Sequence, residues 1–136
     1  MNKKLGNDFE QEFCDILASY GWWCHNMAQN KSGQPADVIA VANDIPVLID
    51  CKVCTHDRFP LTRIEENQQL AMSLWADRGN YYAYFAMKLS NGNIHMVPYR
   101  EMVRRLQSGE RCLYYQDIIL FPLIRDWMRI MGVTRQ

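Results

Sequence analysis

The expected fold is decided by one stretch, Pro35-Ala36-Asp37-Val38-Ile39-Ala40-Val41-Ala42-Asn43-Asp44-Ile45-Pro46-Val47-Leu48-Ile49-Asp50-Cys51-Lys52. Two apolar runs rich in β-branched residues flank Asn43-Asp44, and this pattern predicts two strands joined by a short turn. Asp37, Asp50 and Lys52 lie in or beside those strands. Because burying a charge without a partner is costly, these side chains indicate a site, and a divalent metal ion is one partner that would explain them.

The alternation of side chains along a strand allows a prediction of how these charges meet. Asp50 and Lys52 are two residues apart, so on a strand they point to the same face of the sheet. With a turn over residues 43–46, Asp37 would pair with Lys52, and Ile39 with Asp50. Directly opposed residues share a face, so the two aspartates and the lysine should converge. A register slip of one residue would send Asp37 to the other face.

Length and composition indicate one domain over residues 1–136. The chain has 15 Lys and Arg against 15 Asp and Glu, so its neutral total charge does not suggest a broadly basic DNA-binding protein. No apolar segment approaches the roughly 20 residues of a membrane span, and the first lysines are not followed by an apolar signal-peptide run. We therefore expect a cytoplasmic protein with no membrane partner, in which the five cysteines are reduced thiols.

The remaining segments predict a mixed sheet covered by helices. The first helix carries an apolar stripe at helical spacing and should end at Gly21. Asn91-Gly92 is a strong hairpin signal between two later strands. The sum is an α/β sandwich with a mixed sheet and helices on each side. The expected elements are a helix at 3–20, strands at 22–27, 35–42, 46–52, 81–88 and 93–97, helices at 62–77, 98–107 and 122–131, and a strand or extended arm at 113–120.

One polar side chain in the 62–77 helix has two interpretations. Thr62 is the expected N-cap, with Glu65 at the matching capping-box position. Gln68 falls inside the apolar stripe of this helix, and a buried amide must find hydrogen-bond partners. It is either a satisfied polar group of the core or a side chain that reaches into the site beside the sheet.

The pattern Asp37, then Asp50-Cys51-Lys52, is typical of metal-assisted hydrolysis. Mg²⁺ prefers hard oxygen ligands and keeps several waters, so two or three carboxylates suffice to bind it. Such an ion polarises a phosphodiester and makes its bound water more acidic. A lysine beside it can orient that water, help to deprotonate it, or stabilise the negative transition state.

The chain resembles the PD-(D/E)xK nuclease superfamily, and within it the Holliday junction resolvases of the RecU and archaeal Hjc kinds. The resemblance runs from about Leu5 to Val97, and its parts follow in the family's order. They are Gly6-Asn7-Asp8-Phe9-Glu10 on the first helix, the loop from Lys31 into Asp37, the core triplet Asp50-Cys51-Lys52 with Asp where Glu is common, Phe59-Pro60-Leu61 ahead of Gln68, and Asn93 to Val97 followed by Pro98.

The resemblance implies a restriction-endonuclease-like core and a homodimeric, magnesium-dependent endonuclease, with Mn²⁺ as an alternative metal, that acts on branched DNA such as four-way junctions. It selects Glu10 over Glu12, which periodicity alone leaves open. The residues that it implies for the site are Glu10, Asp37 and Asp50 as metal ligands, Lys52 acting on the attacking water, Gln68 in support, and Lys31 and Ser32 at the DNA backbone. Arg58 and Arg63 form a short basic segment and are further candidates for DNA contact.

Several alternatives stay open. Asp37 could cap a turn while Asp50 pairs with Lys52 or Arg63, with no catalytic site. Cys51 and Cys54 could belong to a zinc or redox site with His56, although a second Cys/His pair is not evident and a regular strand would point the two thiols to opposite faces. Superfamily relatives also include restriction and repair nucleases of duplex DNA, and a non-catalytic relative could bind DNA or protein.

Overall fold

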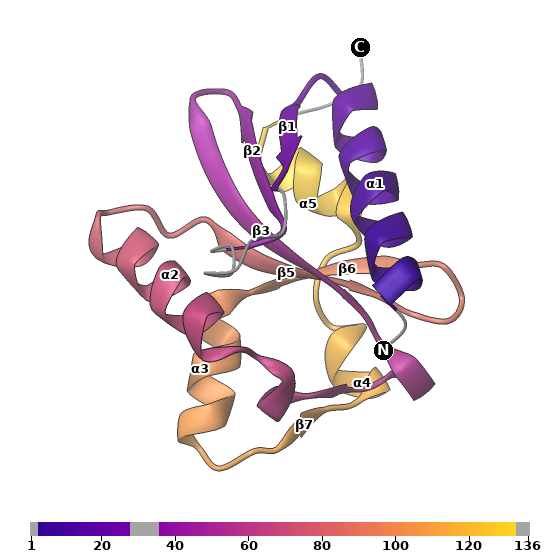
Figure 1. The fold of residues 1–136 in the computed structure, drawn as a ribbon, viewed down its shortest axis with the longest axis vertical. Helices are drawn as coiled ribbons and strands as arrows, with labels where there is room; N and C mark the ends of the chain where they lie inside the picture. The colour runs from indigo at the N-terminus through magenta and orange to yellow at the C-terminus, as the bar shows by residue number, and fades with distance from the viewer. Residues whose placement is uncertain (1–2, 28–35, 133–136) are drawn as a thin grey trace.

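The computed structural model describes residues 3–27 and 36–132 of the 136-residue chain. Helices and strands alternate along it and build a twisted sheet with helices on both sides (Figure 1). The strands are β1 Trp23–Asn26, β2 Val38–Ala42, β3 Ile45–Val53, β4 Phe59–Pro60, β5 Ala83–Lys88, β6 Ile94–Pro98 and β7 Cys112–Leu113. The α-helices are α1 Lys3–Ser19, α2 Glu66–Asp77, α3 Tyr99–Gln107, α4 Tyr115–Ile118 and α5 Ile124–Ile130, with short 3₁₀ turns at Thr55–Asp57 and Leu61–Arg63.

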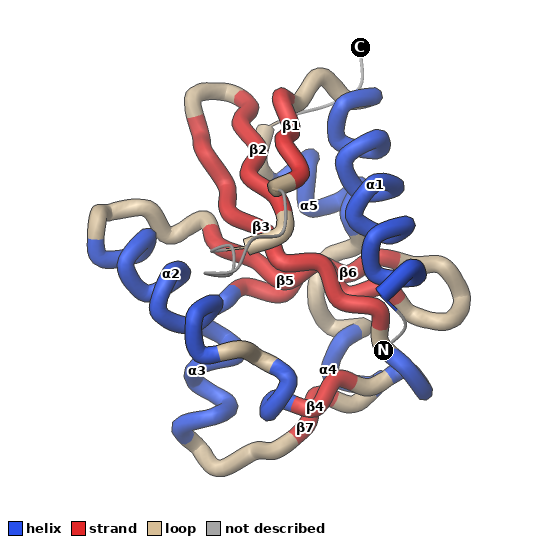
Figure 2. The backbone as a smooth tube through the Cα atoms, viewed as in Figure 1, coloured by secondary structure: helices blue, strands red, loops and turns tan. Residues whose placement is uncertain are grey.

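The main sheet has five strands in the order β1-β2-β3-β5-β6. Strands β3 and β5 run parallel and the other neighbours antiparallel, so the predicted mixed sheet is confirmed. Strands β4 and β7 form a separate antiparallel pair, which Figure 2 shows beside α4. The parallel step from β3 to β5 carries α2, and this crossover brings a helix next to the charged end of β3.

The predicted hairpin exists, but its predicted register is wrong by two residues. Ala42 pairs with Ile45 and Ile39 with Leu48, where the expected partners were Val47 and Asp50. The cause is a tighter turn: Asn43 and Asp44 have φ of 50° and 63° and form the whole loop, as in the two-residue turns that match the twist of a hairpin. Because the error is an even number of residues, the predicted face of every side chain is preserved.

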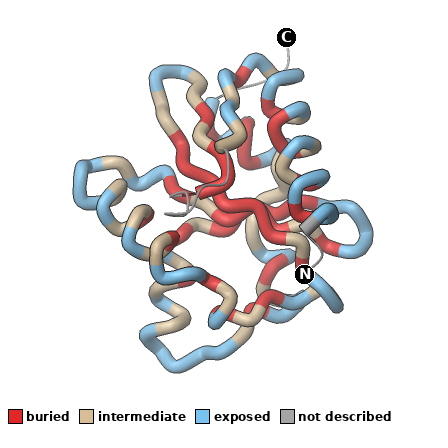
Figure 3. Tube along the Cα trace, viewed as in Figure 1, coloured by how far each residue is buried: buried red, intermediate tan, exposed pale blue. Residues whose placement is uncertain are grey.

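Two apolar cores lie on opposite faces of the sheet. On one face α1 and α5 cover the strands through Phe13, Leu17 and Trp127. On the other, α2 and α3 do so through Met72 and Met102. Figure 3 shows that burial is continuous along the central strands where these layers meet. The charged residues of β3 therefore sit at the most enclosed part of the molecule.

Two expectations from the sequence are wrong at their boundaries. Thr62 does not cap α2: it lies in the 3₁₀ turn, and Glu65 caps the helix in a capping box with Gln68. The segment 113–120 is not an extended arm, because only Cys112–Leu113 is a strand and α4 follows. The Tyr114 backbone N–H donates to Asp117 Oδ2 at 2.9 Å, and this local bond starts the helical turn.

The other elements begin and end close to their predicted limits. Gly21 closes α1 with φ of +90°, a conformation that glycine adopts without strain. Pro98 stands directly before α3, where its fixed φ suits the start of a helix. Within the described ranges, no helix is both long and apolar enough to cross a membrane.

Candidate active site

Asp37 and Asp50 come together where β2 begins beside β3. The β2–β3 ladder ends at the pair Val38 and Ile49, and continuing it by one residue places Asp37 opposite Asp50. The Asp37 carboxylate accepts a hydrogen bond from the Cys51 backbone N–H at 2.8 Å. Its backbone carbonyl accepts one from Met27 N–H, also at 2.8 Å. The position of Asp37 is thus fixed from both neighbouring strands.

Asp50 is fully buried, with 0% of its surface exposed. Its Oδ1 accepts a hydrogen bond from Gln68 Nε2 at 2.9 Å. Its Oδ2 lies 2.9 Å from Lys52 Nζ, yet among the described residues it has no partner with hydrogen-bond geometry. Such an oxygen is costly in a protein interior unless a further positive group reaches it.

Gln68 belongs to this cluster and not only to the core. Its amide N–H bonds Asp50, and its Oε1 lies 3.5 Å from Lys52 Nζ and 3.4 Å from the Glu65 backbone nitrogen. The capping box therefore does two things: it starts α2 and it orients the amide toward β3. Of the two interpretations that the sequence leaves open for Gln68, this placement agrees with the one in which its side chain reaches the charged end of the sheet.

Glu10 reaches the cluster from α1. Its carboxyl group shares side-chain hydrogen bonds with Asp37 and with Asn26 of β1. Burial raises the pKa of Glu10 to about 7, and the neighbouring Asp37 charge and hydrogen bond contribute further, against the opposing effects of Asn26 and Lys52. Glu10 therefore exchanges its proton near neutral pH.

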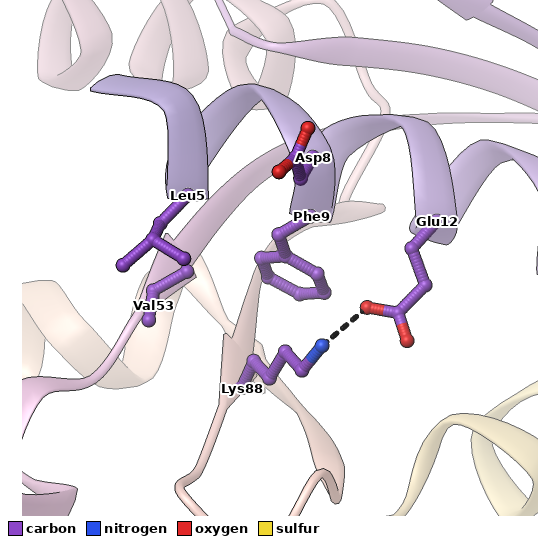
Figure 4. A pocket seen from close by; sticks show the side chains of 6 residues that line it. All are labelled: Leu5, Asp8, Phe9, Glu12, Val53 and Lys88. Atoms are coloured by element: carbon purple, nitrogen blue, oxygen red, sulfur yellow. Dashed lines mark hydrogen bonds and ion pairs between the residues drawn. The ribbon is translucent and has the colours of Figure 1, made fainter. Parts of the chain in front are cut away.

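Glu12 lies on the other shoulder of α1 and makes a different contact. Its carboxylate pairs with Lys88 Nζ at 2.6 Å, beside a pocket that is also lined by Leu5, Asp8, Phe9 and Val53 (Figure 4). The Lys88 ammonium lies 5.6 Å from the centre of the Phe9 ring. The geometry thus separates the two glutamates, with Glu10 at the aspartates and Glu12 at a salt bridge on the outer side.

Among the described residues, the cluster holds more carboxyl groups than positive groups. Burial raises the pKa of Asp50 well above its ordinary range, and the nearby Asp37 charge adds to this, while Lys52 opposes it. Within residues 3–27 and 36–132, three carboxyl groups therefore share one ammonium group. A hard divalent cation would relieve this imbalance, and carboxylate oxygens are the ligands that such a cation takes.

The carboxylates are not arranged as a finished ligand set. Across residues 3–27 and 36–132, no three His, Cys, Asp or Glu side chains form a group that could hold a metal ion. Instead, the Lys52 ammonium supplies the positive charge beside Asp50. The ion pair expected under the non-catalytic alternative is therefore present, within a cluster that also contains Glu10, Asp37 and Gln68.

Of the four predicted DNA-contact residues, the structure describes two, Arg58 and Arg63. Lys31 and Ser32 lie outside the described residues. Arg58 is exposed after the first 3₁₀ turn, and the Arg63 guanidinium lies 5.2 Å from the centre of the Phe59 ring. Contact of these four residues with DNA stays a prediction.

The alternative of a zinc or redox site at Cys51 and Cys54 has no support in the geometry. Cys51 packs in the core under α1, whereas Cys54 packs in the core under α2 and α3. The two thiols point to opposite faces of the sheet, as expected for a regular strand. Both are buried, and His56 is exposed.

Two contacts of the site were not predicted from the sequence. Asn26 bonds Glu10, and the backbone N–H of Cys51 holds Asp37. A polar side chain at the end of an otherwise apolar strand is the one signal that points to Asn26. The Cys51 contact uses the main chain, so no residue type could have indicated it.

Comparison with known proteins identifies the family. The family model described as archaeal Holliday junction resolvase (Hjc) matches residues 1–114, a range that contains all five residues of the cluster. The solved structure of Hjc from Archaeoglobus fulgidus, described as a Holliday junction resolvase from an archaeal hyperthermophile, has the same fold, with a TM-score of 0.69 and 20% identity over 96% of this chain and 98% of that one. No curated protein sequence matches the chain. The chain therefore belongs to the archaeal Holliday junction resolvase family, junction-resolving nucleases of the PD-(D/E)xK superfamily.

Proposed function

We propose that this nuclease cuts four-way DNA junctions by a divalent-metal-dependent hydrolysis at the cluster of Glu10, Asp37, Asp50, Lys52 and Gln68. The observation that carries the proposal is the fully buried Asp50, which shares the neighbouring Lys52 ammonium with the Asp37 and Glu10 carboxyl groups. A buried anion in this condition is a poor structural element. It is well suited to bind a cation that arrives with the substrate.

The three carboxylates are the proposed ligands of Mg²⁺ or Mn²⁺. Asp37 and Asp50 are held by the main chain and by Gln68, while Glu10 is held by Asn26. When bound, the ion neutralises charge on the scissile phosphate and lowers the pKa of a coordinated water. Because the pKa values of Glu10 and Asp50 are raised, binding requires both groups to lose protons and should strengthen as the pH rises.

Lys52 and Gln68 have distinct proposed roles. The Lys52 ammonium can donate to the attacking water or to a phosphate oxygen, where it stabilises charge that develops in the transition state. Gln68 touches both Asp50 and Lys52, so it is a positioning residue that sets the orientation of the other two. Its amide cannot supply or accept a proton at neutral pH, which excludes it as an acid or base.

The family supports the proposed substrate, and the symmetry of that substrate supports the proposed assembly. A four-way junction has two equivalent strands to cut, and two copies of one site related by a two-fold axis would match that symmetry. We therefore propose that the working form is a homodimer. In this form Lys31, Ser32, Arg58 and Arg63 would contact the phosphate backbone, and such contacts weaken as salt increases.

Glu10 and Glu12 offer a matched pair for testing the site. Both lie on α1, two residues apart, but only Glu10 joins the aspartates. Glu10→Gln should weaken Mn²⁺ or Mg²⁺ binding in calorimetry by roughly 10-fold or more and slow junction cleavage. Glu12→Gln should leave both close to wild type. Equal effects of the two substitutions, or metal binding that is unchanged in Glu10→Gln, would remove Glu10 from the site.

A further inference from the structure

Two cysteines from different elements meet beside the carboxylate cluster. Cys14 of α1 and Cys24 of β1 are free thiols whose sulfur atoms lie 3.1 Å apart. A disulfide bond is about 2.05 Å long, so the sulfurs need to approach by only about 1 Å. Cys14 is 8% exposed and Cys24 is partly exposed. A small oxidant therefore has access to the pair from the Cys24 side.

The chemistry of the pair is asymmetric. The Cys24 thiol donates its hydrogen bond to Cys14, and this bond lowers the pKa of the Cys14 thiol against the opposing effect of burial. The thiolate is the form that attacks an oxidant, so Cys14 is suited to react first. Cys51 is the third cysteine in this core, but it is buried and its pKa is raised by that burial and by the nearby aspartates.

The elements that carry this pair also hold Glu10. Cys14 follows Glu10 by four residues, one helical turn along the same side of α1. Cys24 precedes Asn26 by two residues on β1, so the two side chains share a face. The hydrogen bond between Glu10 and Asn26 and the contact between Cys14 and Cys24 are therefore neighbouring links between the same helix and strand.

We propose that Cys14 and Cys24 form a reversible dithiol–disulfide site that a peroxide closes, joining α1 covalently to β1 beside Glu10. The Cys14 thiolate attacks one oxygen of hydrogen peroxide and releases hydroxide, which becomes water, leaving a sulfenic acid. The Cys24 sulfur attacks the sulfenic sulfur while its thiol proton passes to the departing hydroxyl group, which forms the S–S bond and releases the second water. Two thiols thus lose two protons and two electrons, and one peroxide becomes two waters.

The disulfide would act as a clamp on the helix that carries Glu10. It closes a short loop of the chain, and this reduces the conformational freedom of the unfolded state. Because the sulfurs are already close, little strain should be introduced. We expect oxidation to raise the Tm by roughly 5–10 °C, and a dithiol reductant to reverse the increase.

The sequence gives a direct assay for the bond. Trypsin cuts after Lys4 and Lys31, and the peptide 5–31 between them contains Cys14 and Cys24 but no other cysteine. After treatment of the wild-type protein with stoichiometric hydrogen peroxide, this peptide should lose the mass of two hydrogens and resist alkylation. It should regain both alkylation sites after reduction with dithiothreitol. This readout is independent of nuclease activity, so its failure is distinct from failure of the proposed function.

Single cysteine substitutions show which two thiols form the disulfide. Cys24→Ser should abolish both the disulfide and the rise in Tm, whereas Cys112→Ser, which alters a partly exposed cysteine on β7, should abolish neither. A peptide 5–31 that is still alkylated at both cysteines after oxidation would overturn the proposal. So would a cross-link from either cysteine to Cys51. If Cys14 and Cys24 form the disulfide but the Tm falls, the claim that this bond stabilises the protein would be overturned.

Discussion

At the residue scale, the site is defined by an imbalance of charge around Asp50. This carboxylate is fully buried, and Lys52 is the positive side chain beside it. Asp37 and Glu10 add two further acidic groups in the same place. In a simple ion pair one carboxyl group would face one ammonium group, whereas in the described part of the chain three carboxyl groups surround Lys52. This excess of carboxyl groups is the physical reason for proposing a cation at the cluster.

Removing the Lys52 ammonium should damage catalysis more than folding. Lys52→Met keeps an unbranched side chain that is one atom shorter, but loses the charge that faces Asp50. We expect kcat to fall on the order of 10²–10³-fold, while junction binding measured by gel shift in Ca²⁺ is retained. The matched control is Lys88→Met, which loses a salt bridge to Glu12 outside the site. Comparable loss of kcat in both variants would contradict a specific role for Lys52.

The raised pKa of Glu10 predicts an unusual dependence of stability on pH in the absence of metal. An unfolded glutamate has a pKa near 4.5, and the folded value is about 7, so the folded state binds the proton more tightly. The stabilising contribution is complete below pH 4.5 and is lost as the pH rises through 7. Asp50 shifts in the same direction. Glu10→Gln should therefore show a smaller loss of Tm between pH 5 and pH 7 than wild type.

Added Mg²⁺ provides the complementary measurement. A bound cation favours the ionised carboxylates, so it should raise the Tm more at pH 8 than at pH 5. The same titration with Glu10→Gln should give a smaller increase. If the Tm of the wild-type protein rose from pH 5 to pH 7 without metal, this would contradict the stabilising effect that we assign to the protonated Glu10.

Most of the site residues could be predicted because their types conflict with their surroundings. Asp50 and Lys52 interrupt an apolar strand, and Gln68 interrupts an apolar helical stripe. Glu10 carries no such signal, because it is one of two glutamates on the shoulders of α1. It was selected by resemblance alone. The structure separates the two by their contacts with Asp37 and with Lys88.

At the scale of elements, the β2–β3 hairpin places Asp37 and Asp50 side by side. The sequence predicted the hairpin and the shared face, but not the pairing, because alternation has a period of two and cannot distinguish registers that differ by two residues. The deciding feature is the backbone of Asn43 and Asp44, both with positive φ. The Asn43 side chain also donates to the Gly132 carbonyl at 2.8 Å and ties the turn to the end of α5.

The two-residue turn can be tested at Asp44, whose side chain is exposed. Asp44→Gly should stabilise the protein by about 0.5 kcal/mol, because glycine adopts positive φ without steric cost. Asp44→Val should destabilise it by about 1–2 kcal/mol, because a β-branched residue is strained there. Denaturant unfolding of both variants measures the difference. If Asp44→Val were more stable than Asp44→Gly, the result would indicate the longer turn over residues 43–46, in which Ala42 pairs with Val47.

At the scale of the whole molecule, the chain beyond the matched family region completes the core. The family model ends at residue 114, yet Trp127 of α5 is 2% exposed. Its ring stacks on Trp22 with centroids 5.2 Å apart and meets Tyr84 edge-on at 5.4 Å. The helix thereby covers the same face of the sheet as α1. The layer that positions Glu10 depends on both helices.

Trp127→Ala should therefore be strongly destabilising. Loss of the indole leaves a cavity between α5 and the sheet, and such truncations cost about 3–5 kcal/mol. Ile130→Ala on the same helix is the control, because Ile130 is 70% exposed and its loss should change stability by less than about 0.5 kcal/mol. Similar unfolding midpoints for the two variants would show that α5 does not pack as described.

The central claim is metal-dependent cleavage of junctions at the Asp50 cluster, and one measurement tests it most directly. Wild type and Asp50→Asn are each incubated with a labelled four-way junction or with a linear duplex of one of its arms, in Mg²⁺ or in EDTA. We predict that wild type in Mg²⁺ cuts the junction far faster than the duplex, and that EDTA or Asp50→Asn abolishes cutting while Asp50→Asn still binds the junction. Cleavage that persists in EDTA, or that is unchanged in Asp50→Asn, would contradict the account.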